Sequence, residues 1–246
     1  MALDIVDRFA LRTQVTHIEQ AASRTRLIRA AGPDLKGLHW VPGQQVRVLV
    51  NGPVRTLGDL MRTTLRTYSV WSYEEDRIEL CVFQHGDGPG SRWADELKVG
   101  DEISFRRPEG RFVLDRHAPY HLFVGEETAT IAFGAMLRSL AAEADAGAAA
   151  DAYAVLEASD EASRLALPGT ARTSWVDRGE ASAANSTVLL DALRALKLPE
   201  HPGVAYVAGE ARTCQSVRAH LMRERGWPRR SVIVKPFWAP GRRGME

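Results

Sequence analysis

The chain has 246 residues, and its apolar share of 45% and charged share of 26% are those of a soluble globular protein with one or two domains. Its 32 basic residues against 31 acidic ones leave a formal net charge of +1, which argues against a nucleic-acid binder. The sequence has no apolar run that could span a bilayer and no signal peptide, and its two cysteines, Cys81 and Cys214, form no metal-ligand pattern. We therefore expect a cytoplasmic protein that does not insert into membranes.

The first half of the chain has the pattern of short strands separated by glycine, proline and polar turns. Several strands at this spacing predict a barrel or a sandwich, and we expect a small antiparallel barrel that ends near Asp115. The predicted strands lie at residues 12–20, 24–32, 44–50, 65–72, 77–86 and 101–114.

The second half alternates between strands and helices, which predicts βαβ units and a mostly parallel sheet. The expected strands are 120–127, 151–159, 172–178, 203–210 and 231–238, and the expected helices are 128–144, 186–198 and 211–226. Ser186 or Thr187 is the expected N-cap of the middle helix. We place the domain boundary between residues 116 and 117.

Residues 66–71, Arg-Thr-Tyr-Ser-Val-Trp, combine a cation, an aromatic ring and a small hydroxyl on one predicted strand. Arg66 is suited to a pyrophosphate, Tyr68 to the face of a ring system, and Ser69 to a ring nitrogen. A barrel strand with one solvated arginine and a half-buried tyrosine explains the same letters, because so short a motif also arises by chance.

The second stretch, residues 83–97, ends a strand at Gln84 or His85 and continues through Gly86, Gly88, Pro89 and Gly90. Ser91 is then the expected N-cap of a short helix. Glycines let the backbone approach a ligand, and a helix N-terminus attracts anions, so this loop is a candidate phosphate site. A plain strand-to-helix loop is the alternative.

The third feature is a pair of strand ends, Gly-Glu-Glu-Thr at 125–128 and Gly-Glu-Ala-Arg at 209–212. Each closes an apolar strand and opens a helix, so in a parallel sheet both turns lie at one edge, where a nicotinamide or a partner can dock. Two tight strand-to-helix turns are the simpler explanation, and the chain lacks the G-x-G-x-x-G dinucleotide fingerprint.

Together these stretches resemble the siderophore-interacting proteins, which are FAD-binding ferric-siderophore reductases of the ferredoxin-reductase superfamily. The resemblance is carried by R-T-Y-S at 66–69, H-G-D-G-P-G-S-R-W-A at 85–94, G-E-E-T-A at 125–129 and Y-V-A-G-E-A-R from Tyr206 onward. It implies a six-stranded antiparallel Greek-key barrel for FAD, followed by an α/β domain for the electron donor, NAD(P)H or ferredoxin.

The resemblance also implies roles for individual residues. Arg66 and the loop from Gly88 through Pro89 and Gly90 to Ser91 would contact the FAD phosphates, with Thr67 and His85 nearby. Tyr68 and Ser69 would face the isoalloxazine, with Ser69 near its N5 atom. Thr128 and Glu210 would lie on the nicotinamide side. Lys235, Arg242 and Arg243 are candidates for binding an anionic ferric siderophore, and a solvated basic tail is the alternative for these three.

Two positions depart from the family pattern. Trp71 stands where the family usually has an arginine, which removes one charge beside the flavin. The usual Gly-Tyr-Trp near the end is replaced by Pro236-Phe237-Trp238.

Two other functions remain open at this stage. One is a general NAD(P)H:flavin or quinone reductase on the same scaffold. The other is a non-catalytic protein that binds a siderophore or a flavin.

Overall fold

The structure is a computed structural model that describes residues 10–50, 65–86, 88–146, 151–169, 171–184 and 186–242. The chain divides into two compact units, Met1–Arg111 and Phe112–Glu246. The sequence places the boundary slightly later, after residue 116. Within the described residues, no helix is both long and apolar enough to cross a bilayer.

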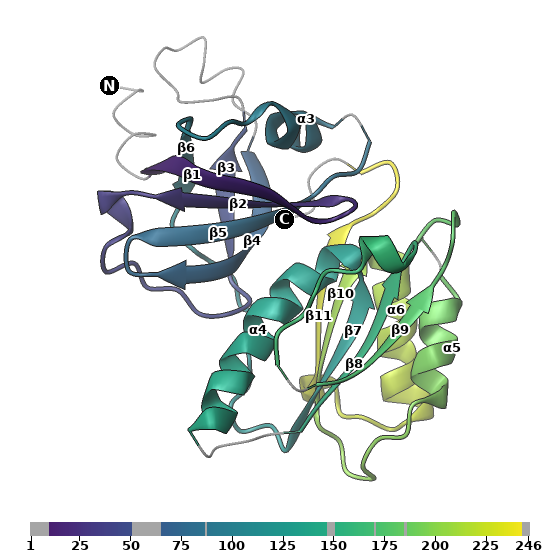
Figure 1. Cartoon of the computed structure of the whole chain (residues 1–246). Helices are drawn as coiled ribbons and strands as arrows, with labels where there is room; N and C mark the ends of the chain where they lie inside the picture. Colours follow the sequence, from purple (N-terminus) through teal and green to yellow (C-terminus); the bar gives the residue numbers. More distant parts are fainter. Residues whose placement is uncertain are drawn as a thin grey trace. The chain divides into compact units, whose positions relative to one another are not determined.

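The first unit is the closed, six-stranded antiparallel barrel that the sequence predicts (Figure 1). Its strands follow the order β1-β2-β5-β4-β3-β6 around the barrel, so neighbours in space are not always neighbours in sequence. Their bounds are β1 Ala10–Ala22, β2 Thr25–Ala31, β3 Gln45–Leu49, β4 Leu65–Glu74, β5 Arg77–Phe83 and β6 Glu102–Arg106, with a 3₁₀ turn η1 at Pro33–Leu35.

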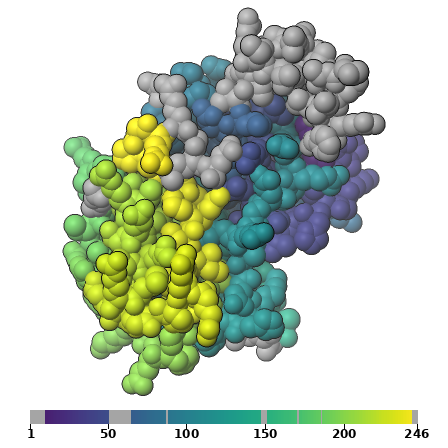
Figure 2. Space-filling view, turned by 180° about the vertical axis from the view of Figure 1, so that it is seen from behind, coloured from purple at the N-terminus to yellow at the C-terminus, as the bar shows by residue number. Residues whose placement is uncertain are grey.

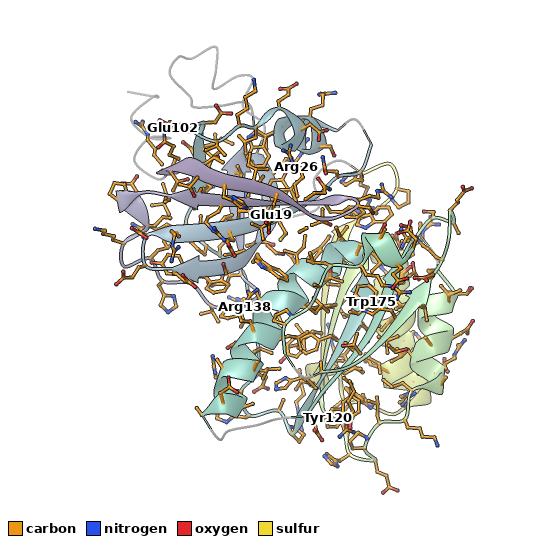
Figure 3. All side chains as sticks on the ribbon, viewed as in Figure 1. Glu19, Arg26, Glu102, Tyr120, Arg138 and Trp175 are labelled. Atoms are coloured by element: carbon orange, nitrogen blue, oxygen red, sulfur yellow. The ribbon has the colours of Figure 1, made fainter. Side chains whose placement is uncertain are left out.

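Alternating apolar side chains fill the barrel, as the two-residue period of a strand requires. Val46, Val48, Val70, Leu80 and Phe105 are all fully buried there. Helix α3, Pro89–Glu96, adds Trp93 and Ala94 to this core. Arg26 of β2 donates to the carbonyl of Ala94 and so fastens α3 to the barrel wall (Figure 3).

The second unit is a parallel five-stranded sheet in the order β11-β10-β7-β8-β9. Its strands are β7 Tyr120–Glu126, β8 Asp151–Ala158, β9 Arg172–Asp177, β10 Val204–Glu210 and β11 Val232–Trp238. The helices are α4 Glu127–Asp145, α5 Val188–Ala195 and α6 Ala211–Ala219, with a π-helical turn η3 at His220–Glu224 and 3₁₀ turns η2 at Glu161–Ser163 and η4 at Arg229–Ser231.

Helices cover both faces of this sheet. Phe133 and Met136 of α4 pack on one face, whereas Leu193 of α5 and Val217 of α6 pack on the other. Figure 1 shows α4 on one side and α5 and α6 on the opposite side, and Figure 2 shows α6 in yellow-green next to β11 in yellow. The carboxyl ends of β7 and β10, which carry Glu126 and Glu210, lie next to each other at one edge of the sheet, where helices α4 and α6 begin.

Strand β11 is at one margin of the sheet, which suits the Pro236 that it contains, because proline cannot donate to a second neighbour. Its register against β10 shifts near the end. Gly209 pairs with Pro236, but Glu210 pairs with Trp238, so Phe237 is the additional residue. Phe237 packs against Phe112, with ring centroids 6.3 Å apart.

Candidate functional site

Strands β4 and β5 diverge where the Arg-Thr-Tyr-Ser stretch lies. β5 pairs with β4 from Val70 to Glu74, and residues 65–69 of β4 pair with β3 instead. The N–H of Val70 donates to Gln44 on the β3 side at 3.2 Å. Because amide directions alternate along a strand, the N–H groups of Thr67 and Ser69 point to the other edge, which has no strand partner among the described residues.

The start of α3 lies directly against this part of β4. The Tyr68 ring stacks on Trp93 of α3, with centroids 5.7 Å apart and an interplanar angle of 23°. A Cβ at Gly90 would lie 2.5 Å from the Tyr68 hydroxyl and 3.6 Å from Cγ of Arg66. The fold thus joins the first two stretches that the sequence singles out, and only glycine at position 90 leaves Tyr68 where it is.

Arg66 and Tyr68 share one face of β4, and Thr67 and Ser69 share the other. The half-buried Arg66 guanidinium donates to the carbonyl of Leu65 at 2.8 Å, and burial raises the pKa of Tyr68, so its hydroxyl stays protonated. Ser69 lies opposite Gln45 of β3 in the strand register, whereas the backbone N–H and carbonyl of Gln45 bond to Glu109.

Ser91 is not the N-cap of the short helix, contrary to the prediction. The helix begins three residues earlier than predicted, with Gly88 as N-cap and Pro89 in its first position. Proline is suited to that position because it lacks the N–H that a helix start leaves unpaired. Ser91 is buried and instead closes the loop, because its hydroxyl accepts from the N–H of His85 at 3.1 Å and donates to the His85 carbonyl at 3.2 Å.

His85 lies at the surface beside the end of β5. Its ring stacks on Phe83 with centroids 6.3 Å apart, and partial burial, followed by the charge of Arg24, lowers the pKa of His85. His85 is therefore largely neutral at pH 7. With Pro89 carrying no N–H, the N–H groups of Gly90 and Ser91 are the donors of the first turn that have no acceptor among the described residues.

These features suit a flat ligand that carries phosphates. The start of α3 offers N–H donors and the positive end of a helix dipole to an anion, next to the Arg66 cation. The unpaired edge of β4 offers further N–H and C=O groups to a ring with polar atoms at its rim. FAD has both parts, and the residues of the barrel fit it.

At the carboxyl edge of the second unit, Glu126 is 2% exposed and accepts several hydrogen bonds. The Thr128 N–H donates to it at 2.9 Å, the Thr128 hydroxyl donates too, and the Trp238 indole N–H donates at 3.0 Å. Burial raises the pKa of Glu126 to about 7, although these donors oppose the rise. The sequence pattern singles out Thr128 but not Glu126.

Glu210 is fully buried at the end of the neighbouring strand β10. Its Oε2 accepts from the N–H of Thr213 at 2.8 Å, which caps α6, and its Oε1 has no hydrogen-bond partner among the described residues. Burial, followed by the charges of Glu126 and Glu210, raises the pKa of Cys214. Two buried carboxyl groups thus occupy the neighbouring ends of β7 and β10.

A second buried acid cluster lies beside them. Arg178, just after β9, binds Glu127 through two hydrogen bonds of 2.6 and 2.8 Å and reaches Glu157 of β8 at 3.4 Å. Burial raises the pKa of Glu157, and the Ser186 hydroxyl donates to it. No sequence motif linked these residues to one another, because Arg178 and Glu127 lie 51 residues apart.

The predicted substrate cations are only partly placed. Lys235 is half-buried on β11 and pairs through its backbone with Ala208, and Arg242 is exposed after the strand. No carboxylate in the described part of the chain pairs with either. Arg243 lies outside the described residues. Trp71, which replaces an expected arginine, is 7% exposed on β4 and packs as a buried aromatic.

Two family models match the chain. The model described as "Siderophore-interacting FAD-binding domain" matches residues 42–112, and the model described as "Siderophore-interacting protein" matches residues 118–241. The first match covers the later part of the barrel unit, and the second covers most of the α/β unit.

Among characterised proteins, the chain is similar to the ferric vibriobactin reductase ViuB of Vibrio cholerae, with 26% identity over 184 residues. That match covers 72% of this chain and 65% of the reductase, so the chain aligns with less than two thirds of its relative.

Among solved structures, a siderophore utilization protein from T. fusca superposes with a TM-score of 0.77 at 23% identity, covering 96% of this chain and 95% of that one. The siderophore-interacting protein SipS from Aeromonas hydrophila gives a TM-score of 0.74 at 23% identity, covering 94% and 98%. These structural matches concern the fold.

Proposed function

The chain belongs to the siderophore-interacting protein family, and we propose that it is an FAD-dependent ferric-siderophore reductase that takes electrons from a soluble donor, NAD(P)H or ferredoxin. The observation that carries the proposal is the contact of Gly90 with Tyr68 and Arg66, beside the unpaired edge of β4. It brings a cation, a helix start and an open strand edge together in the unit that the FAD-binding family model matches.

In this proposal, the barrel holds the cofactor. Arg66 and the first turn of α3, from Gly88 to Ser91, bind the phosphates, and Thr67 and Ser69 present backbone N–H groups to the ring. Tyr68 supports the ring face from its place on Trp93. Ser69 adds a hydroxyl near the N5 edge. Bound FAD would supply the redox chemistry, because a flavin accepts a hydride and releases electrons singly to Fe(III).

The remaining residues act on donor and substrate. Thr128 and Glu210 border the nicotinamide side at the switch point of the sheet, where open α/β sheets bind ligands. Lys235 and Arg242 attract an anionic ferric chelate. Reduction frees the iron, because Fe(II) carries less charge than Fe(III) and hard oxygen ligands hold it less tightly.

The test reconstitutes the purified protein with FAD and follows flavin absorbance without oxygen. We expect NAD(P)H or reduced ferredoxin to bleach the flavin, and a ferric chelate to restore its colour while an Fe(II) trap develops its own. Quinones or free flavin that reoxidise the protein faster than every ferric chelate would indicate a general reductase instead. Tight flavin or chelate binding without bleaching by any donor would indicate a non-catalytic binding protein.

A further inference from the structure

The order of the strands in the second unit shows where a dinucleotide's adenine ribose would lie. Counted from β7, the order β9-β8-β7-β10-β11 reads 3-2-1-4-5, which is the doubly wound order. In this architecture, a carboxylate at the end of the second strand binds the ribose 2′-hydroxyl of NAD, and an arginine there accommodates the 2′-phosphate of NADP. The second strand of this unit is β8, with β9 beside it.

Both arginines at these strand ends are already held by carboxylates. Arg164 donates to both oxygens of Asp177, the last residue of β9, at 2.8 and 2.7 Å. Arg178 is bound by Glu127 and Glu157, and its side chain is only 9% exposed. Neither guanidinium can bind a phosphate without giving up its carboxylate partner. For Arg178, that change would leave the buried carboxylates of Glu127 and Glu157 unpaired.

Exposed carboxylates surround the same strand ends. Asp160, Glu161 and Glu180 are all exposed, and hydrogen bonds from the hydroxyl and N–H of Ser163 lower the pKa of Asp160. Asp160 is therefore negatively charged at pH 7. A phosphate dianion placed beside these carboxylates is repelled, whereas a neutral hydroxyl can donate to one of them.

We propose that the ends of β8 and β9 select NADH over NADPH, because their carboxylates accept a ribose 2′-hydroxyl while Asp177 withholds Arg164 from a 2′-phosphate. The proposal rests on the proposed function, in which a nicotinamide nucleotide reduces the flavin. It names NADH as the electron donor, which the sequence leaves open.

The first test compares the two nucleotides in anaerobic reduction of the FAD-loaded protein. We expect the second-order rate constant for NADH to exceed that for NADPH by about tenfold or more, the size that one modest repulsion gives. The second test needs no redox chemistry. In calorimetric titrations, 5′-AMP should bind more tightly than adenosine 2′,5′-bisphosphate.

A variant with a matched control isolates the role of the clamped arginine. Asp177→Asn frees Arg164 and removes a charge, so the preference for NADH should shrink roughly fivefold or more, through tighter binding of the 2′-phosphate. Glu143→Gln frees Arg116 in the same way, but this pair joins the segment before β7 to the end of α4, away from the carboxyl ends of β8 and β9. This control should leave the preference unchanged.

Three results would overturn the proposal. The first is an NADPH rate equal to or above that of NADH, and the second is an unchanged preference in Asp177→Asn. The third is a flavin that neither nucleotide reduces. In that last case, photoreduced protein mixed with a ferric chelate still tests the proposed reductase, so the two failures remain distinguishable.

Discussion

Glu126 accepts hydrogen bonds from Thr128 and Trp238 in a place that water hardly reaches. Burial favours its neutral form and the donors favour its charged form, and the balance raises its pKa from 4.5 to about 7. Between these two values the folded protein binds a proton that the unfolded chain has released. The contribution of Glu126 to stability therefore falls as the pH rises through this window.

This balance predicts how a neutral replacement behaves. Glu126→Gln should gain about 3 kcal/mol in free energy of unfolding relative to the parent between pH 4.5 and pH 8, because each unit of pKa shift is worth about 1.4 kcal/mol. Urea unfolding followed by tryptophan fluorescence at several pH values measures the difference. A difference between variant and parent that is the same at all pH values would show that Glu126 keeps an ordinary pKa.

The sequence alone could not reveal the role of Glu126 as a buried hydrogen-bond acceptor. In the stretch 125–128 the letters Glu126 and Glu127 look like ordinary residues of a strand-to-helix turn. Glu126 gains its role from Trp238, which lies 112 residues away along the chain. The motif did predict that the two strand-to-helix turns, which carry Thr128 and Glu210, lie at one edge of the sheet, as they do.

Among the elements, the contact between β4 and α3 brings the barrel's candidate residues together. Gly90 fits against the Tyr68 hydroxyl, whereas Gly88, the N-cap, has open space around the position of a Cβ. The two glycines are two residues apart at the start of α3 and differ in the space that a Cβ would find, which makes Gly88 a control for Gly90.

Gly90→Ala should weaken FAD binding by about tenfold or more, because the new methyl group must push Tyr68 away from Trp93. Gly88→Ala should weaken binding much less, because nothing lies within 4 Å of a Cβ at that position and Tyr68 stays in place. Quenching of flavin fluorescence measures both dissociation constants. Equal affinities in the two variants would place the FAD site away from this contact.

The sequence predicted most of the strands and helices, because apolar runs such as 203–210 leave little choice of structure. It was wrong about Ser91, because the preference for serine at an N-cap was weaker than that of Pro89 for the first helical position. The divergence of β4 from β5 depends on pairings between distant strands, which no local pattern encodes.

At the scale of the whole molecule, each unit has its own apolar core. One core fills the barrel, and the α/β unit has two, one on each face of its sheet. Separate cores of this kind usually unfold as separate cooperative units. The change from a strand pattern to an alternating strand-and-helix pattern near the middle of the sequence predicts a boundary after residue 116, and the two compact units meet after Arg111.

Calorimetry should therefore resolve two unfolding transitions. Bound FAD should raise the midpoint temperature of the transition that belongs to the barrel. At a free FAD concentration 100-fold above its dissociation constant, the gain is about 2.7 kcal/mol, which corresponds to roughly 10 °C for a domain of this size. Phe133→Leu, in the fully buried core under α4, should lower only the other transition and so identify it. A single transition that responds to both changes would contradict the prediction.

The extra residue in β11 affects which deletions and substitutions this protein tolerates. Because Trp238 rather than Phe237 is opposite Glu210, the indole reaches Glu126 while Phe237 packs on Phe112. Removing any one residue between Val232 and Phe237 would move both rings back by one position and turn each toward the opposite face of the sheet, without altering either ring. The spacing of this segment is thus constrained more strictly than the identity of its residues, and point substitutions there are easier to accept than deletions.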